Sequence, residues 1–334
     1  MDSDRIRGCA LRAIDERVFP GCVIGISKGS ERLIVPFGKL RYDEPEVATE
    51  HTVYDVASLT KSIPTASLAL SLIDKGALAL LDPVKKYIPE LENDFGATIE
   101  DLLRYRVRGP RMSTLQSKVS SDIEAHVLAH GFDGPPSEGA YTNLPAFLLG
   151  LIVEKAGGDT LQTLAQKEFF DPLGMKDTTF FPNVGLRKSH IAPTEVSEER
   201  GEVRGLPHDE SAYVFAKALR AVGHAGLFST APDMLTFLQA LIDARFPYIV
   251  DGARAGLVWQ VNEAYFMGLR AGEHVFGKTG FTGCSVLCDT DRGIGLVILS
   301  NRTYPKRPAD ADSLTSAVNH FRSNIADIVF SDQR

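Results

Sequence analysis

Strand-forming patterns stand near both ends of this 334-residue chain, and helical patterns fill the long stretch between them. Near the start, CVIGISKGSERLIVPFG (residues 22–38) has two apolar segments around a polar turn, which predicts a β-hairpin. After about residue 255, β-rich runs follow between turns, in the order AYFMGLRAG, HVFGKTG, CSVLCDT and GIGLVILSNR. The sequence therefore predicts strands at both ends with a helical insert between them.

The insert reads as several helices separated by Pro- and Gly-rich breaks. IPTASLALSLIDKG (63–76) is nearly all apolar and predicts a buried helix with Gly76 as its C-terminal cap. TIEDLLRY, LPAFLLGLIVEKAGG, TLQTLAQKEFFDPLG and FSTAPDMLTFLQALI predict further helices, and a capping-box pattern from Thr230 to Asp233 opens the last of these. Helical periodicity also marks residues 5–18 and the C-terminal DSLTSAVNHFRSNIADIVF.

Length, charge and hydropathy exclude several classes of protein. A chain of 334 residues predicts one large domain or two interleaved subdomains. The net charge of −7 and the lack of a long basic run argue against a nucleic-acid partner. No apolar run approaches the roughly 20 residues of a membrane span. The N-terminus lacks the apolar stretch of a secretory signal, so we expect a cytoplasmic protein, or a periplasmic or secreted one if a leader was removed.

Histidine and cysteine spacing gives little support for a metal site. His126 and His130 are four residues apart, but no HExxH-type acid and no further ligand accompany them. We therefore expect neither a metal nor a cofactor. Reduced, mostly buried thiols are the expectation for the four cysteines, which form no CxxC motif: Cys9, Cys22, Cys284 and Cys288.

The stretch YDVASLTK places Ser58 three residues before Lys61, at the start of the apolar helix. This spacing puts both side chains on one helix face. A helix N-terminus also directs backbone N–H groups and positive potential toward this point. That field favours a developing oxyanion and disfavours the charged form of Lys61, so the pair suits a nucleophile and its base. Many helices begin with serine, so a simple helix cap remains the alternative.

Two further short motifs add polar groups. In Tyr141-Thr142-Asn143, the phenol can relay protons near a lysine and the amide can hold a substrate carbonyl or position the lysine. In Lys278-Thr279-Gly280, a strand-borne lysine supplies positive charge and the glycine lets the backbone approach a substrate closely. The amides of Phe281 and Ser58 would then donate to an oxyanion. A loop tyrosine and a β-turn with a surface lysine are the alternatives.

In this order and context, Ser-x-x-Lys, Tyr-x-Asn and Lys-Thr-Gly resemble the serine β-lactamase and penicillin-binding protein superfamily. The resemblance is to its class C-like branch, which includes class C β-lactamases, D-alanyl-D-alanine carboxypeptidases and family VIII esterases. It runs from about residue 18 to 302. Further matching segments are GALALLDPVKKYIPEL, LLGLIVEKAGG, FFDPLGMKDTTF and GHAGLFSTAPDM.

The resemblance implies an α+β fold in a single domain spanning residues 1–334. An antiparallel sheet flanked by helices would come from residues 1–61 and 251–334, and residues 62–250 would form a mostly helical part. The active site would lie in the crevice between these subdomains. The resemblance also implies that the partner is a small-molecule ester, amide or β-lactam and that the protein is a monomer or weak homo-oligomer.

The resemblance implies a role for each motif residue. Ser58 would be acylated, while Lys61 and Tyr141 would share the proton transfers, with the identity of the base left open. Asn143 would contact Lys61 and the substrate. Lys278 and Thr279 would polarise Tyr141 and anchor a substrate carboxylate, with Gly280 and Phe281 beside them.

We expect an esterase-like activity on a carboxyl ester or small amide. A β-lactamase or D-alanyl-D-alanine carboxypeptidase is the alternative, and a non-catalytic penicillin-binding module is an alternative of another class. Substrate preference is open because the branch's His-Thr-Ser-Gly stretch is replaced here by LRYRVRG (103–109). Pro64 is a further departure, which predicts a kink in the helix just beyond Ser58.

Other residues resemble catalytic groups but stand in the wrong context. Gly25–Gly29 matches the GxSxG elbow of α/β-hydrolases, but a second strand follows where that elbow needs a helix, so Ser27 is not expected to be a nucleophile. His208 and His224 match structural segments of the branch. We expect both to have packing roles.

Overall fold

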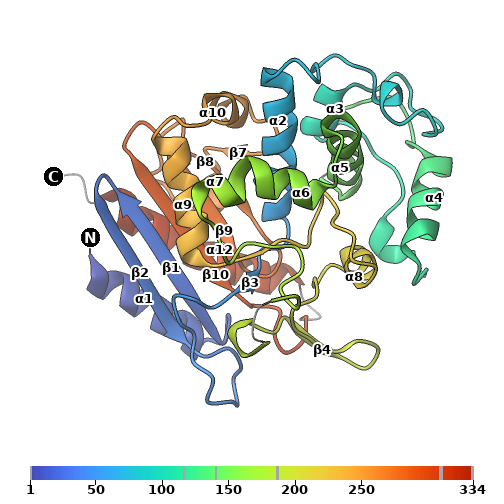
Figure 1. Ribbon diagram of the computed structural model, residues 1–334. Helices are drawn as coiled ribbons and strands as arrows, with labels where there is room; N and C mark the ends of the chain where they lie inside the picture. Colours follow the sequence, from blue (N-terminus) through green and yellow to red (C-terminus); the bar gives the residue numbers. More distant parts are fainter. Residues whose placement is uncertain (1, 116, 140, 186–187, 308–310, 332–334) are drawn as a thin grey trace.

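The computed structural model describes residues 2–115, 117–139, 141–185, 188–307 and 311–331. Its main feature is a six-stranded antiparallel sheet in the order β2-β1-β10-β9-β8-β7 (Figure 1). The sheet strands are β1 (Gly21–Lys28), β2 (Glu31–Gly38), β7 (Gln260–Val261), β8 (Phe276–Thr279), β9 (Ser285–Asp289) and β10 (Ile294–Ser300). Two short pairs lie apart from it: β3 (Tyr54–Asp55) with β6 (Phe228–Ser229), and β4 (Glu195–Ser197) with β5 (Gly201–Val203).

Both chain ends build this sheet. The predicted hairpin is confirmed, since β1 and β2 pair from Lys28↔Glu31 to Gly21↔Gly38. On its other edge β1 pairs with β10, so that Cys22 lies opposite Ser300 although 278 positions separate them in the chain. The predicted α+β fold with an antiparallel sheet is therefore confirmed.

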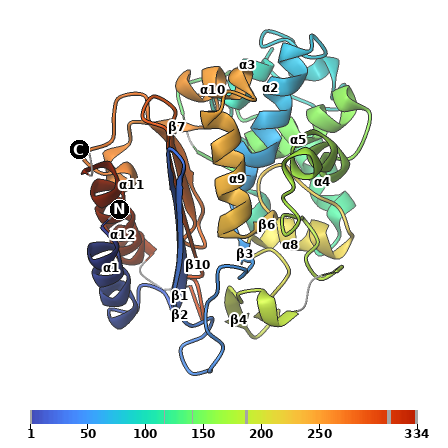
Figure 2. The same ribbon diagram turned by 60° about the vertical axis from the view of Figure 1, so that its left-hand side comes forward.

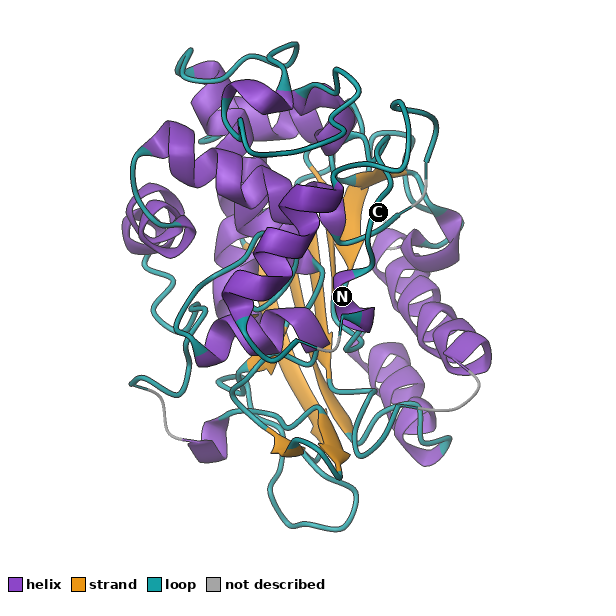
Figure 3. Cartoon of the chain, turned by 90° about the vertical axis from the view of Figure 1, so that its right-hand side faces the viewer, coloured by secondary structure: helices purple, strands orange, loops and turns teal. Residues whose placement is uncertain are grey.

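Helices cover both faces of the sheet (Figures 2 and 3). On one face lie α1 (Ser3–Asp15), α11 (Ala264–Met267) and α12 (Ala311–Ser331), with α9 (Ala231–Ile242) on the other. Beyond α9 lie α2 (Ser67–Asp74), α3 (Ile99–Leu103), α4 (Ser120–His130), α5 (Leu144–Gly157), α6 (Leu161–Ala165), α7 (Asp171–Leu173), α8 (Glu210–Lys217) and α10 (Pro247–Arg254). In the described ranges, no helix combines the length and the apolar character needed to cross a bilayer.

Two hydrophobic cores hold these layers together. Val23 of β1 packs in the core under α9, whereas its neighbours Ile24 and Ile26 pack with α1 and α12. Because both faces of β1 and β10 are buried, their sequences are continuous apolar runs, which is typical of sheets covered on both sides. The division into subdomains at residues 61 and 251 stays a prediction.

The predicted strand in AYFMGLRAG is wrong. Residues Ala264–Met267 form the short helix α11, and Gly268 follows at a φ of 79°. The consecutive residues Phe266 and Met267 are both buried in the core shared with α12, which strand alternation would not allow on a single face. A short apolar run is ambiguous between strand and helix, and tertiary packing decided in favour of the helix here.

The helix that follows Ser58 is broken near its start. Helical conformation begins at Leu59, and Lys61–Ala66 is a π-helical segment that runs into α2. Ile63 has non-helical angles (φ −120°, ψ 107°), because the residue before a proline is disfavoured in the α conformation. The kink predicted from Pro64 is therefore confirmed, and Gly76 follows α2 with a φ of 73°, as expected of a C-terminal cap.

Two predicted helix starts can be compared at their caps. Thr230 accepts a hydrogen bond from Asp233 N and caps α9, as predicted. The Asp233 carboxylate, however, accepts from Asp177 N and Thr178 Oγ1, so the cap is not reciprocal. A reciprocal capping box occurs instead at α3, between Thr98 and Asp101.

Candidate active site

A buried turn presents Ser58 at the start of its helix. Asp55, at the end of β3, accepts hydrogen bonds from Ala57 N (2.8 Å) and His208 N (2.7 Å). Ala57 has a φ of 48°, a region that residues with a side chain rarely adopt, so these contacts offset local strain. Ser58 itself is partly exposed and faces a pocket.

Lys61 lies directly beneath Ser58. Its Nζ donates to Ser58 Oγ at 2.8 Å and to the His224 carbonyl oxygen at 2.7 Å. Burial lowers the pKa of Lys61 from 10.5 to about 8, and the charge of Asp209 opposes part of this shift. Roughly one such amine in ten is then neutral at pH 7, against about one in three thousand for an ordinary lysine.

Tyr141 lies between the two buried amines of the site. Its ring centroid is 5.4 Å from Lys61 Nζ and 4.7 Å from Lys278 Nζ. Desolvation raises the pKa of the Tyr141 phenol, and hydrogen bonding with Ser58 lowers it. Because Tyr141 is 56% exposed, water reaches it and limits the rise, but the hydroxyl stays protonated at neutral pH in either case.

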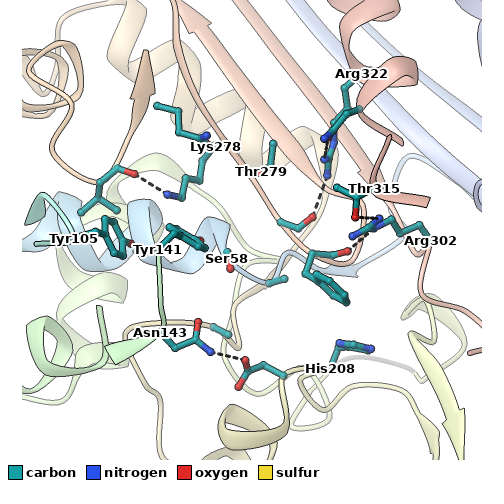
Figure 4. A pocket seen from close by; sticks show the side chains of 18 of the residues that line it. Ser58, Tyr105, Tyr141, Asn143, His208, Lys278, Thr279, Arg302, Thr315 and Arg322 are labelled. Carbon is teal, nitrogen blue, oxygen red and sulfur yellow. Dashed lines mark hydrogen bonds between the residues drawn. The ribbon is translucent and has the colours of Figure 1, made fainter. Parts of the chain in front are cut away.

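Lys278 projects from β8 and is also buried. Its Nζ donates to the Val258 carbonyl oxygen at 2.9 Å (Figure 4). Burial, and then the charge of Lys61, lower the pKa of Lys278 to about 7. The structure thus brings four side chains together from three separate segments: Ser58 with Lys61, Tyr141, and Lys278.

Gly280 allows the end of β8 to approach the nucleophile turn. A Cβ atom at Gly280 would lie 2.4 Å from the Val56 carbonyl oxygen, closer than any side chain tolerates. The neighbouring amides of Phe281 and Ser58 donate to no acceptor among the described residues. They are therefore available to an oxyanion, as the sequence predicts.

We expect Gly280→Ala to lower kcat/KM at least tenfold, because the added methyl group must push β8 away from the Ser58 turn. Unfolding in urea should show a loss of about 1–3 kcal/mol, as overpacked sites do. The matched control is Gly8→Ala on α1, where nothing lies within 4 Å of the added Cβ. Full activity in Gly280→Ala would contradict the need for close approach.

The pocket in front of Ser58 has a volume of about 660 Å³ and two unlike ends (Figure 4). Tyr105 and Tyr141 line an aromatic end, where their ring centroids are 5.1 Å apart. Three arginines line the other end: Arg302, Arg307 and Arg322. Arg307 pairs with Glu210 at 3.0 Å, whereas the other two have no acidic partner within the described ranges. This end therefore suits an anionic group.

Among the described residues, no hydrogen bond joins Asn143 to Lys61, the contact that the resemblance implies. Asn143 Nδ2 donates to Asp209 Oδ2 at 2.8 Å, and the Lys61 amine donates to Ser58 Oγ and to the His224 carbonyl oxygen. The Asp209 carboxylate competes for the amide because it is a charged acceptor. Asp209 therefore takes the place of Lys61 as the hydrogen-bond partner of Asn143. Asn143 does line the pocket, together with Thr279, Gly280 and Phe281.

The remaining sequence candidates either lie outside the pocket or pack against neighbouring residues. Ser27 is buried on β1 and does not line the pocket. His224 is buried beneath Lys61, and His208 stacks on Phe281 with ring centroids 5.6 Å apart. Among the residues that the structure describes, no group of three or more His, Cys, Asp or Glu side chains could hold a metal ion.

Several pocket residues carry no sequence motif that would single them out. Asp209 stands next to Glu210 in LPHDES, which is no catalytic motif, and Tyr105 lies in the segment that departs from the branch. Arg322 did carry a signal, since it stands on the apolar face of the C-terminal helix next to Phe321 and near Ile325. A charge on such a face indicates a buried, hydrogen-bonded group, and Arg322 donates to the Gly280 and Cys284 carbonyl oxygens.

Comparison with known proteins extends over nearly the whole chain. The family model described as Beta-lactamase matches residues 10–319. The chain is 27% identical over 321 residues to a protein of Escherichia coli (strain K12) with the provisional name D-alanyl-D-alanine carboxypeptidase. That match covers 80% of this chain and 73% of the relative.

Solved structures share the fold at low sequence identity. A β-lactamase from Sulfitobacter sp. EE-36 superposes with a TM-score of 0.74 at 19% identity, covering 98% of each chain. The D-amino acid amidase from Ochrobactrum anthropi SV3, complexed with L-phenylalanine amide, gives a TM-score of 0.74 at 19% identity and covers 99% of each chain.

Proposed function

Because the chain belongs to the β-lactamase family, we propose that it is a serine hydrolase that cleaves a carboxyl ester or small amide through a covalent acyl-enzyme at Ser58. The observation that carries this proposal is the 2.8 Å hydrogen bond from the buried Lys61 amine to the Ser58 hydroxyl in an open pocket. An amine with a lowered pKa beside a serine hydroxyl is the arrangement that activates a serine nucleophile.

The proposed reaction has two halves. The neutral Lys61 amine takes the Ser58 proton as Oγ attacks the carbonyl carbon, while the amides of Ser58 and Phe281 donate to the oxyanion. The bond to the leaving group then breaks, and the proton passes to that group through Lys61 or Tyr141. Water attacks the acyl-enzyme in the second half, which releases the carboxylic acid and restores the Ser58 hydroxyl.

Lys61 suits the role of base better than Tyr141. Its pKa of about 8 leaves a useful neutral fraction at pH 7, whereas the Tyr141 phenol stays almost wholly protonated. We assign to Tyr141 the donation of a proton to the leaving group, and the Lys278 amine 4.7 Å from its ring centroid supports this role. The aromatic end of the pocket offers apolar contact to an ester or amide substituent.

A second candidate is a D-alanyl-D-alanine carboxypeptidase or β-lactamase. The arginines at the other end of the pocket favour it, because both kinds of substrate carry a carboxylate. The name of the Escherichia coli relative supports the peptidase. Lys278 and Thr279 would then help to anchor that carboxylate, as the resemblance implies.

The proposal is tested by intact-mass spectrometry after mixing the protein with a short-chain chromogenic ester, a D-alanyl-D-alanine peptide and a penicillin. We expect a mass increase equal to one acyl group, together with fastest turnover of the ester. Ser58→Ala should form no adduct, and Ser27→Ala should behave as wild type because Ser27 lies outside the pocket.

The other outcomes separate the alternatives. Turnover of the peptide or penicillin without the ester would favour the second candidate. A stable penicillin adduct without turnover of any substrate would indicate a binding module. An adduct that persists in Ser58→Ala would refute the assignment of the nucleophile.

A further inference from the structure

One carboxylate, that of Asp209, joins two segments that flank the Lys61–Ser58 pair. It caps α8 by accepting from Ala212 N at 2.9 Å and also accepts from Ser211 Oγ at 2.7 Å. Across the pocket floor it accepts from Asn143 Nδ2 at 2.8 Å (Figure 4). It also lies 3.2 Å from His224 Nε2. A helix cap alone requires only the first of these contacts.

His224 connects this carboxylate to the lysine. The His224 side chain is fully buried, and its ring is held by Asp209, by Ser211 Oγ at 3.0 Å and by edge-to-face packing on Phe147. The carbonyl oxygen of the same residue accepts from Lys61 Nζ at 2.7 Å. Asp209 thus fixes the residue whose backbone fixes Lys61.

Asp209 also supplies negative charge near the buried amine of Lys61. It is the acid whose charge acts on Lys61, where it opposes the effect of burial on the pKa. Burial raises the pKa of Asp209, but interaction with His224 and hydrogen bonds from His224, Ala212 and Ser211 hold it well below its usual range. The other titratable or charged groups around Asp209 and Lys61 are Asp55, Tyr141, Arg200, His208, Glu210, His224, Lys278 and Arg307.

We propose that Asp209 is a positioning residue for the acyl transfer, which orients Asn143 and, through His224, the amine that activates Ser58. The inference rests on the proposed function. With Nδ2 bound to Asp209, the Asn143 carbonyl oxygen is left to accept an N–H group of a substrate. Removing only the charge at residue 209 should therefore change catalysis while leaving the fold intact.

The test compares Asp209→Asn with wild type, because asparagine caps helices as well as aspartate does. Reaction of Ser58 with a fluorophosphonate probe, in which Oγ attacks phosphorus and fluoride leaves, is followed from pH 6 to 10. We expect the plateau of the pH–rate profile to fall on the order of tenfold. We also expect the acid limb, the part of the profile where the rate rises with pH, to move about one unit to lower pH. The reason is that Lys61 loses its proton more easily without the negative charge of Asp209. Asp209→Glu should move the limb back toward wild type.

The matched control is Asp233→Asn on α9. Asp233 is also a buried acid at a helix start, with hydrogen bonds from Asp177 N and Thr178 Oγ1, but it does not line the pocket. The acid limb of the pH–rate profile of Asp233→Asn should stay where it is in wild type. If Asp209→Asn does not fold, Asp209→Ser keeps a cap without the charge.

An acid limb that stays in place in a folded Asp209 variant would overturn the positioning role and leave the acyl-enzyme untouched. Failure of wild-type Ser58 to react with the probe would instead overturn the proposed function and, with it, this inference. The two failures are therefore distinguished by the wild-type reaction alone.

Discussion

Replacing Lys61 with methionine is expected to lower kcat/KM on the order of 10³- to 10⁴-fold, the upper range for loss of a general base. Methionine keeps most of the buried volume but removes the amine that lies 2.8 Å from Ser58 Oγ and would accept its proton. The measurement is steady-state hydrolysis of the best substrate together with the rate at which the acyl adduct forms. Both should fall in parallel, because the base acts before the acyl-enzyme exists.

The matched control for Lys61→Met is Lys75→Met, just beyond the end of α2. Lys75 is exposed and pairs with Glu168, so its loss removes one positive charge from the same helical segment without touching the pocket. We expect near wild-type activity there, since surface ion pairs contribute about 0–1 kcal/mol. Adduct formation at the wild-type rate in Lys61→Met would transfer the role of base to Tyr141.

The sheet could be predicted from the sequence because its strands carry strong local signals. The hairpin turn, the Lys-Thr-Gly strand and the apolar run of β10 each combine β-forming residues with turns at their ends. Pro64 likewise predicted the break in the helix that follows Ser58. The failure at Ala264–Met267 came where a short apolar run fits either period and only packing against α12 decides.

The site could be predicted only as far as motifs reach. Ser58, Lys61, Tyr141 and Lys278 stand in three recognisable patterns, and all four meet in space. The partner of Asn143 could not be predicted, because a contact over 66 positions to a lone aspartate leaves no local pattern. The charge balance of the pocket was hidden for the same reason, since it depends on which isolated acids and arginines the fold brings together.

The electrostatic cost of the site leads to a second large effect, on stability. Lys278 is only 3% exposed, and its pKa falls from 10.5 to about 7 because of burial and then the charge of Lys61. Between these two pH values the unfolded chain holds more protons than the folded one, so Lys278 makes stability rise with pH. Its contribution can reach about 1.4 kcal/mol per pH unit in this window.

We therefore expect Lys278→Met to stabilise the protein by about 1–3 kcal/mol near pH 7 while lowering kcat/KM at least a hundredfold. The Val258 carbonyl oxygen loses its partner in this variant, which offsets part of the gain. Urea unfolding at pH 6.5, 8 and 9.5 should show the advantage over wild type shrinking as the pH rises toward 10.5. Lys155→Met, at an exposed position on α5, should show no such trend.

A constant difference between Lys278→Met and wild type across this pH range would mean that Lys278 keeps an ordinary pKa in the folded protein. The positive charge of Lys278 would then be present at no cost to the stability of the fold. If the difference instead shrinks as expected, the same desolvation that destabilises the fold at neutral pH is what prepares the two amines for proton transfer. Burial of the two lysines would then lower the stability of the fold and raise the activity of the site at the same time.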